Sequence, residues 1–394
     1  MKFIIKIAAF FGKNYKPAAV IYLLIVIAIT IQQSASLSRI ARPDGGFYYK
    51  YNNYVIFKNS FLHLIHQQDL YQQYPVEQYD LFKYSPAFAL FFGQFAYLPN
   101  ALGLFSWGLL NAFCLFFAIK SLPDLADKKK IAILFFVLIE LITSIQNSQS
   151  NALVAGLIIL AFSCLEKRNY FAACLFIVTT AFIKIFGLLG FVLFLFYPGK
   201  VRMVAYAAIC FLFFAFVPLV AIPYDQLLLL YKSWLHLLVT DQPVAYHPSF
   251  SGWLESWFHL FVANKILVAG GLFFFLLPLI KWKQYVTDFH ARLWWLSSLL
   301  IWVVIFNHKA ESPTFIIAVA GAAIWYFGQE RNVANQVLIW LVFVFTALSP
   351  TDIFPDAIQD DIFIPYVIKV VPCIFVWFKI TFDLLTSKQA PALS

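Results

Sequence analysis

The sequence predicts an all-α polytopic membrane protein, a bundle of about 12 transmembrane helices. First, 62% of its 394 residues are hydrophobic and 12% are charged, whereas a soluble domain has roughly 45–50% apolar and about 25% charged residues. Second, apolar runs recur along the whole chain, so one cleaved signal peptide cannot account for them. Third, the net charge of +9 comes from short basic clusters beside those runs. This placement is typical of topology signals and disfavours a nucleic-acid-binding patch.

Each predicted element is an apolar segment, because a spanning helix needs about 20 apolar residues. Residues 169–198 are basic at both ends, so we expect two short helices that turn near Ile183 to Gly187. Segment 85–98 begins with Ser85-Pro86 and predicts a re-entrant or interfacial helix. Residues Phe3 to Phe11 are expected to lie along the cytoplasmic interface. The candidate spans are residues 18–36, 101–121, 131–146, 149–165, 169–184, 186–198, 201–221, 266–281, 292–306, 313–328, 334–349 and 365–385.

The basic clusters orient the chain in the membrane. Four lysines precede the first span, and the later clusters fall on the same side if the N-terminus is cytoplasmic, as the positive-inside rule prefers. The opposite face then receives two long loops, 37–84 and 222–264, and three shorter segments. We therefore expect residues 1–394 to form a single transmembrane domain in the cell (inner) membrane.

Aromatic residues and cysteines each have a simple interpretation. Tyrosines and tryptophans, Tyr48 among them, crowd the outer loops. They form either the usual interfacial belt, which is the favoured interpretation, or surfaces on which sugars stack. The five cysteines lie inside apolar runs without metal-ligand spacing. We interpret them as core residues, and we predict neither a metal nor a cofactor.

Asp44 stands alone just beyond the first span, next to Gly45 and Gly46. Glycines let a backbone approach a ligand closely, and a carboxylate at the low-dielectric boundary of a membrane is suited to general-base catalysis. The alternative is a helix N-cap, a position at which aspartate is favoured. The spacing alone does not choose between the two.

Further polar residues fall at helix mouths on the same face. Gln149 and Asn151 could hydrogen-bond sugar hydroxyls, or cap and connect helices. Lys184 ends an apolar helix, where an ionisable residue indicates function unless it snorkels to the interface. In the run Asn307-His308-Lys309-Ala310-Glu311, the histidine can orient a carboxylate and the lysine can bind phosphate. His247 lies in a turn that faces either substrate or solvent.

These motifs follow one another in a distinctive order. Along the chain they are Asp44 with Phe47-Tyr48-Tyr49, Asp69-Leu70-Tyr71, Lys83-Tyr84-Ser85-Pro86, Gln149-Ser150-Asn151, Ile183-Lys184-Ile185-Phe186 and His308. The order resembles glycosyltransferase family 87, a group of polyprenyl-phosphate-mannose-dependent mannosyltransferases in the GT-C superfamily. Two positions depart from the pattern. Ser148 stands where a glycine usually precedes the Gln-x-Asn element, and Gly45 replaces an acid of some GT-C enzymes, which speaks against a metal-dependent pair of acids.

The resemblance implies a GT-C-like bundle with short outer-face loop helices, in which the outer loops carry or cover the active site. It implies transfer of a hexose, expected to be mannose, from a polyprenyl-phosphate donor to a lipid or glycan acceptor on the periplasmic (extracytoplasmic) face, with inversion. Membrane lipids are the further expected partners, nucleic acid is not, and the protein is expected to be a monomer. The implied roles are general base for Asp44, assistance for His308, donor phosphate binding for Lys184, Lys309 and Arg42, and substrate contact for Tyr48, Tyr84, Gln149, Asn151 and His247.

Two other functional classes remain open at this point. A lipid-linked oligosaccharide ligase or polymerase would share the outer face and the donor class. A polytopic lipid or sugar transporter would place ionisable residues at the bilayer midplane and show repeated halves. The charges of this chain gather instead at one face, which favours an enzyme.

Overall fold

The computed structural model describes residues 14–35, 39–41, 47–240, 247–330 and 332–386, and nearly all of its secondary structure is helical. This confirms the predicted all-α class. The segment Phe3 to Phe11 lies outside the described residues. The elements are α2 (Lys16–Ala35), β1 (Arg39–Ala41), β2 (Phe47–Tyr49), α3 (Asn52–Ile65), α4 (Pro86–Ala96), α5 (Asn100–Ser121), α6 (Asp127–Phe136), α7 (Leu138–Gln146), α8 (Asn151–Glu166), α9 (Tyr170–Ile183), η1 (Ile185–Phe196), α10 (Lys200–Phe216), η2 (Val217–Val220), α11 (Tyr224–Thr240), α12 (Phe250–Phe258), α13 (Asn264–Leu276), η3 (Leu277–Lys281), α14 (Trp282–Thr287), α15 (Phe289–Ile305), η4 (Ser312–Thr314), α16 (Phe315–Phe327), α17 (Val333–Leu341), η5 (Val342–Ala347), α18 (Asp356–Ile358), η6 (Gln359–Phe363), η7 (Ile368–Val370) and α19 (Val371–Thr386).

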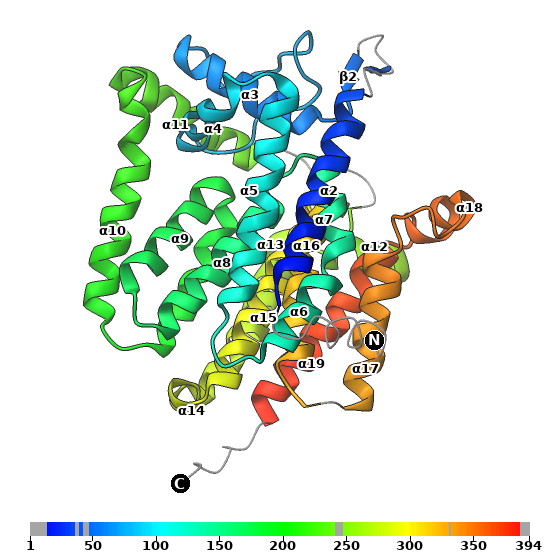
Figure 1. Ribbon diagram of the computed structural model, residues 1–394. Coiled ribbons are helices and arrows are strands. Elements are labelled where there is room, and N and C mark those ends of the chain that lie inside the picture. The colour runs from blue at the N-terminus through cyan, green and yellow to red at the C-terminus, as the bar shows by residue number, and fades with distance from the viewer. Residues whose placement is uncertain (1–13, 36–38, 42–46, 241–246, 331, 387–394) are drawn as a thin grey trace.

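The long helices give the molecule two different ends (Figure 1). At one end, which we call the capped end, the short helices α3 and α4 and the helix α11 lie over the ends of the longer helices. At the opposite end, which we call the basic end, one turn joins α8 to α9 and another joins η1 to α10. The first turn contains Lys167 and Arg168, and Lys200 directly follows the second. Between the two ends, α5 packs on α8 and α15 packs on α16. Every residue of α16 is buried, and this helix lies in the core.

Four described helices are long and apolar enough to cross a membrane, namely Lys16–Ala35, Asn100–Ser121, Lys200–Val220 and Asn264–Thr287. A fifth is the pair 356–363 and 368–386, which is bent by 80°. Seven further apolar helices have only 10–17 residues, or about 15–26 Å at a rise of 1.5 Å per residue. Each of the predicted spans overlaps a helix, but the number of full membrane crossings stays a prediction.

The chain between residues 169 and 198 turns back on itself as the sequence predicts. Helix α9 ends at Ile183 and η1 begins at Ile185, and the intervening Lys184 has an extended backbone with φ −137° and ψ 119°. A Cβ added at Gly187 would lie 2.6 Å from the Thr180 side chain, so the two helices approach too closely for any side chain there. Lys184 therefore lies at the tip of a tight helical hairpin.

The segment 85–98 forms the short helix α4. The Ser85 side chain accepts a hydrogen bond from the Phe88 backbone N–H at 3.2 Å, and Pro86 occupies the first helical position. Both residues favour the start of a helix. The serine side chain accepts a hydrogen bond from a backbone N–H that has no partner within the helix, and proline has no backbone N–H that would need one. The Ser85 hydroxyl also donates to the Phe182 carbonyl at 2.5 Å, which fixes the start of α4 against the end of α9.

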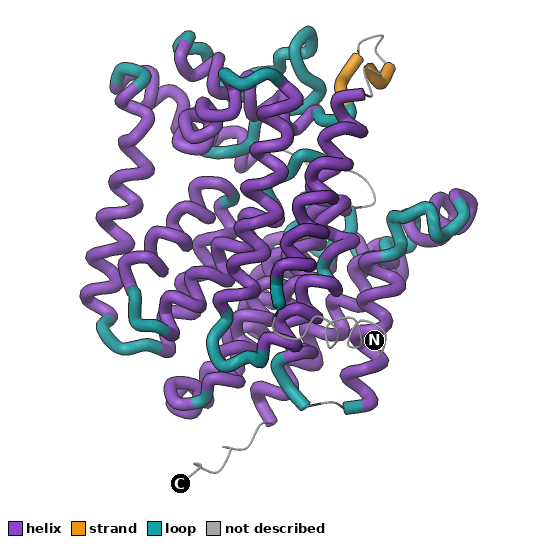
Figure 2. The backbone as a smooth tube through the Cα atoms, in the orientation of Figure 1, coloured by secondary structure: helices purple, strands orange, loops and turns teal. Residues whose placement is uncertain are grey.

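A small hairpin in the first outer loop was not predicted (Figure 2). Strand β1 pairs antiparallel with β2, with Ile40 opposite Tyr48. Strands of three residues are too short for an alternating pattern to reveal them. Residues 42–46 connect the strands, and they include Arg42 and Asp44, which lie outside the described residues.

Two buried ion pairs fasten segments that are distant in sequence. Glu166 accepts hydrogen bonds from Arg292 Nε at 2.6 Å and from the Tyr197 hydroxyl at 2.6 Å. Lys369 Nζ lies 2.5 Å from Glu140 Oε1 and joins η7 to α7. A buried charge is tolerated when it is paired, so these contacts hold α7 and α8 in place. The loop between those two helices reaches the candidate site described below.

The contact of α5 with α8 yields a first prediction. A Cβ added at Gly156 would lie 2.7 Å from Cys114 Sγ and 2.9 Å from the α5 backbone. We expect Gly156→Ala to lower the thermal unfolding temperature, because overpacking costs about 1–3 kcal/mol. The matched control is Gly270→Ala in α13, where a Cβ meets nothing within 4 Å. That change should leave the unfolding temperature equal or higher, since alanine favours a helix, and an equal loss in both variants would contradict the argument.

Candidate functional site at the capped end

A cavity of about 520 Å³ lies at the capped end. Helices α3 and α11 contribute to it, together with the loops that precede α4, α8, η1, α12 and α16. Its wall combines apolar side chains, among them Ile56, Phe57, Ile183 and Phe186, with polar and charged ones, among them Lys83, Tyr84, Gln149, Lys184, Lys309 and Glu311. Such a wall suits a ligand that has both a polar head and an apolar part.

A chain of side-chain hydrogen bonds links a cation to an anion in this wall. Lys184 Nζ donates to Asn151 Oδ1 at 2.6 Å, Asn151 Nδ2 donates to Gln149 Oε1 at 3.0 Å, and Gln149 Nε2 donates to Glu311 Oε2 at 2.6 Å. Since an ammonium can only donate and a carboxylate can only accept, both amides have one permitted orientation. The relay therefore fixes the Lys184 ammonium relative to the Glu311 carboxylate across 127 positions of sequence, the difference between the two residue numbers.

Lys184 owes its position to the break between α9 and η1. Its side chain lies in the wall of the cavity, with Nζ 6.0 Å from the centroid of the Tyr84 ring. Burial lowers the pKa of Lys184 to about 8, while the Glu311 carboxylate raises it and the Lys83 charge lowers it. Lys184 is thus a cation at neutral pH that loses its charge more readily than an exposed lysine.

The two amides do not act as helix caps. Asn151 is fully buried at the start of α8, and its Nδ2 also donates to the Pro313 carbonyl at 3.0 Å. Gln149 precedes α8 and reaches Glu311 from the loop. Their hydrogen bonds to Glu311, Pro313 and Lys184 connect segments that are distant in sequence, and contact of the amides with sugar hydroxyls stays a prediction.

Tyr84 is held rigidly beside the relay. The Tyr71 hydroxyl donates to the Tyr84 carbonyl at 2.9 Å, and the Ser150 hydroxyl lies 3.3 Å from the Tyr84 hydroxyl. Its ring stacks on Phe88 with centroids 4.7 Å apart and packs edge-on against Phe57 at 4.8 Å. The phenol therefore presents a fixed polar edge at the cavity.

Further charged groups complete the wall. Lys83 forms an ion pair with Asp80 at 3.2 Å, and both residues line the cavity. The Lys309 backbone N–H donates to Asn307 Oδ1 at 3.0 Å, which shapes the turn after α15. His247 Nδ1 lies 2.8 Å from the Ser249 hydroxyl, and burial lowers the pKa of His247. The imidazole is accordingly neutral at pH 7 and serves as a hydrogen-bonding group.

The structure brings together most of the residues predicted from the sequence, but not all of them. Tyr84, Gln149, Lys184, His247 and Lys309 line the cavity, and Asn151 lies directly behind Lys184. His308 lies in the turn beside Asn307 and Lys309 without being among the lining residues. Tyr48 stacks on Tyr79 at 4.9 Å, next to the cavity residue Asp80. Arg42 and Asp44 are outside the described residues.

Glu311 is the residue that the sequence analysis named in a polar run without giving it a role. It stands in the notable run after α15, and it begins the η4 turn with a reciprocal cap in which its backbone N–H donates to Thr314 Oγ1 at 3.3 Å. The usual capping box has serine or threonine first and glutamate or glutamine three residues later, so the reversed order here gives no recognisable signal. The contact with Gln149 and the position in the cavity wall are what make Glu311 part of the site.

These features define a multi-spanning helical membrane protein with a charged cavity at one end of its bundle. The model of glycosyltransferase family 87 matches residues 82–350, and the chain belongs to that family. The protein is therefore a membrane glycosyltransferase, which acts on a sugar donor and an acceptor. No curated protein matches the chain. The matched segment contains Lys83, Tyr84, Lys184 and Glu311, whereas Asp44 precedes it.

Proposed function

We propose that the protein transfers a hexose, with mannose as the expected sugar, from a polyprenyl-phosphate donor to a lipid or glycan acceptor. The transfer takes place on the non-cytoplasmic face of the cell (inner) membrane. The observation that carries this proposal is the Lys184 ammonium, which lies in a cavity wall beside apolar residues and is fixed by the relay to Glu311. A phosphate attached to an isoprenoid matches such a wall in charge and in polarity.

The leaving group of this reaction explains why cations gather here. When the glycosidic bond breaks, the donor phosphate becomes more negative, and fixed positive groups stabilise the transition state. Lys184 and Lys309 both line the cavity, and Arg42 is the third candidate for the phosphate. The hydrogen bond from Lys184 to Asn151 uses one of the three ammonium protons, so two remain to donate to phosphate oxygens.

Asp44 is the proposed general base, which takes the proton from the acceptor hydroxyl as that oxygen attacks the anomeric carbon. The attack displaces the polyprenyl phosphate from the opposite side and inverts the anomeric centre. One step of this kind needs one base and a phosphate clamp, and no enzyme nucleophile. Support comes from β2, which follows residues 42–46 directly and whose Tyr48 stacks on Tyr79 beside the cavity residue Asp80.

The remaining parts of the proposal concern topology. The short helices of the capped end would lie at the outer interface and exclude water from the base, which matters because hydrolysis competes with transfer. The basic end would face the cytoplasm, as the positive-inside rule prefers. We also propose that the shorter helices complete a GT-C-like bundle of about 12 crossings, and that the protein acts as a monomer.

One assay tests the donor class. Purified protein is incubated with radiolabelled polyprenyl-phosphate sugars and a membrane lipid extract, and both products are separated. We expect labelled sugar in the acceptor together with released polyprenyl phosphate. Release of polyprenyl diphosphate would identify a ligase or polymerase instead, and movement of the intact donor across proteoliposomes without sugar transfer would identify a transporter.

His308 supplies a second prediction. Its position in the turn next to Lys309 favours assistance to the base, through orientation of a carboxylate or sharing of a proton. We expect His308→Ala to reduce the transfer rate by about 10²-fold with the Km for donor nearly unchanged. The matched control is His290→Ala on α15 near the basic end, which should retain full activity. Equal rates for both variants would remove His308 from the mechanism.

A further inference from the structure

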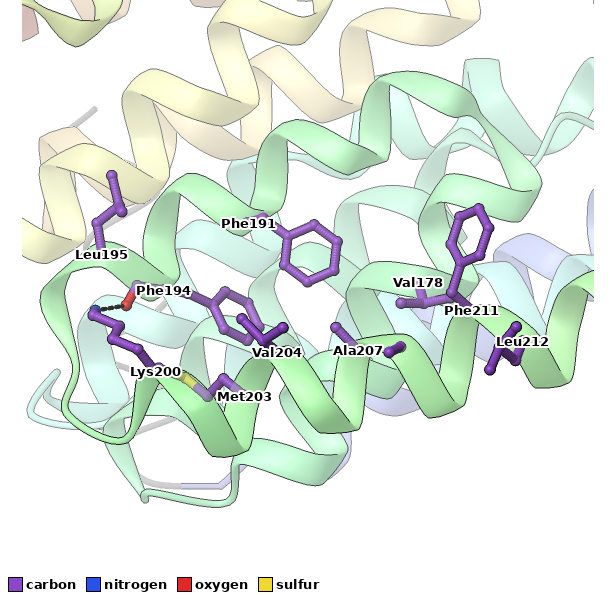
Figure 3. Close-up of a pocket in the computed structure, with 11 residues that line it drawn as sticks. Val178, Phe191, Phe194, Leu195, Lys200, Met203, Val204, Ala207, Phe211 and Leu212 are labelled. Carbon is purple, nitrogen blue, oxygen red and sulfur yellow. Dashed lines mark hydrogen bonds between the residues drawn. The ribbon is translucent and has the colours of Figure 1, made fainter.

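A second cavity, of about 660 Å³, lies between the hairpin of α9 and η1 and the helix α10. Apart from Lys200, all of its lining residues are apolar, and they include Val178, Phe191, Phe194, Met203 and Phe211. Figure 3 shows these side chains gathered from α9, η1 and α10, with Lys200 at one end and Phe211 and Leu212 at the other. We call this cavity the η1–α10 groove, and it is distinct from the cavity at the capped end.

The groove lies on the outer surface of the helix bundle. Helix α10 with η2 is one of the apolar spans, and only 17% of its most apolar window is buried. Val204 and Leu212, which line the groove, are 68% and 56% exposed. In a membrane these surfaces contact lipid, so the groove is filled by a hydrocarbon chain and not by water.

The polar end of the groove is cationic. Lys200 starts α10 after Gly199, which has a left-handed backbone with φ +81°, and its ammonium donates to the Phe194 carbonyl (Figure 3). The Gly199 turn lies against Tyr170 of α9, since a Cβ at Gly199 would be 3.3 Å from that ring. The α8–α9 turn with Lys167 and Arg168 precedes Tyr170 directly.

The carboxylate that directly precedes the Lys167–Arg168 turn, Glu166, is bound by Arg292 and by the Tyr197 hydroxyl. Arg202, two residues after Lys200, is exposed. Lys200 is therefore the basic residue that lines one end of the apolar groove, and Lys167, Arg168 and Arg202 belong to the adjoining turns. Each basic residue near a membrane surface attracts anionic lipid with about 1 kcal/mol.

We propose that the η1–α10 groove is a binding site for an anionic phospholipid of the leaflet at the basic end, which inserts one acyl chain among Phe191, Phe194 and Phe211 and places its phosphate at Lys200. Charge complementarity selects this occupant. A lipid without net charge would gain the apolar contacts but not the interaction with the Lys200 ammonium. The proposal does not depend on the identity of the sugar donor, because the donor phosphate is assigned to Lys184 in the other cavity.

Native mass spectrometry of the full chain in detergent tests the proposal. The protein is titrated with phosphatidylglycerol and with phosphatidylcholine of the same acyl chains. We expect phosphatidylglycerol to bind about tenfold more tightly, and Lys200→Gln to remove most of that preference. The control Lys283→Gln changes an exposed lysine near the basic end, outside the groove, and should leave the preference intact. Equal binding of the two lipids, or an unchanged preference in Lys200→Gln, would overturn the proposal.

A second pair of variants tests the acyl chain. Ala208 lines the groove, whereas Ala205 lies on the same helix outside the lining, and both are exposed. Ala208→Trp should fill the groove and weaken phosphatidylglycerol binding about tenfold, while Ala205→Trp should not. Thermal unfolding of both variants checks that they fold. If Ala208→Trp weakens binding of polyprenyl phosphate and leaves phosphatidylglycerol binding unchanged, the groove holds the donor tail and the proposal is wrong.

Discussion

Asp44→Asn is expected to abolish sugar transfer while the protein remains folded and binds its donor. Asparagine keeps the size and the hydrogen-bonding oxygen of the side chain but cannot accept the proton of the acceptor hydroxyl. Loss of a general base typically costs 10²–10⁴-fold in rate, so we expect turnover to fall at least about 10²-fold. The measurement is the rate of transfer at saturating donor, together with donor binding and the thermal unfolding temperature.

Two comparisons make this result specific. Asp225→Asn changes an exposed carboxylate in the first turn of α11 and should leave the rate unchanged. Glu311→Gln tests the acid that accepts a hydrogen bond from Gln149 in the cavity relay. If Asp44→Asn retains full turnover and Glu311→Gln has none, the general base is Glu311 and not Asp44.

Lys184→Met should weaken donor binding by about 10–100-fold and acceptor binding much less. A charge-assisted hydrogen bond contributes about 1.5–3 kcal/mol, and each 1.4 kcal/mol corresponds to tenfold in affinity. Methionine keeps the apolar stem of the side chain and removes the ammonium. Lys232→Met is the control, because Lys232 is an exposed lysine on α11. Equal weakening of donor and acceptor binding would contradict the assignment of Lys184 to the phosphate.

The pH dependence of donor binding gives an independent test of Lys184. Its pKa in the ligand-free protein is about 8, so the ammonium is present below that pH and is lost as the pH rises through it. Donor affinity should therefore decrease between about pH 8 and pH 10. The decrease extends above pH 8 because a bound phosphate raises the pKa of Lys184. Lys184→Arg should keep a flat affinity over this range, because arginine stays charged.

The helical organisation was predictable because its signals are local. A run of apolar residues identifies a helix wherever it occurs, and each predicted span overlaps a helix of the structure. The hairpin of α9 and η1 followed from one further local signal, the basic residues at both ends of a short apolar stretch. The β1–β2 hairpin was missed since strands of three residues carry no periodic pattern. The number of crossings was also beyond the sequence, because many of the helices are shorter than a bilayer is thick.

The composition of the site was predictable in part. Gln149, Asn151 and Lys184 stood out because polar and ionisable residues are rare in apolar surroundings and each needs a reason to be there. Glu311 belonged to a run that stood out, residues 307–312, but its types and spacing assigned no role to that carboxylate. Its contact with Gln149 joins residues 162 positions apart, and no local pattern contains that information.

The sequence by itself determined that this protein is helical, that it is a membrane protein and that its cations lie at the ends of apolar segments. Hydropathy and the positions of charges are local properties, so they can be read from short stretches of sequence. Only the tertiary structure decided which of those polar residues meet. The directed relay from Lys184 through two amides to Glu311 exists because α8, the α9–η1 hairpin and the η4 turn pack at the same end of the bundle. Packing of that kind depends on the shapes of buried surfaces along the whole chain. The same packing separates the charged cavity from the apolar η1–α10 groove.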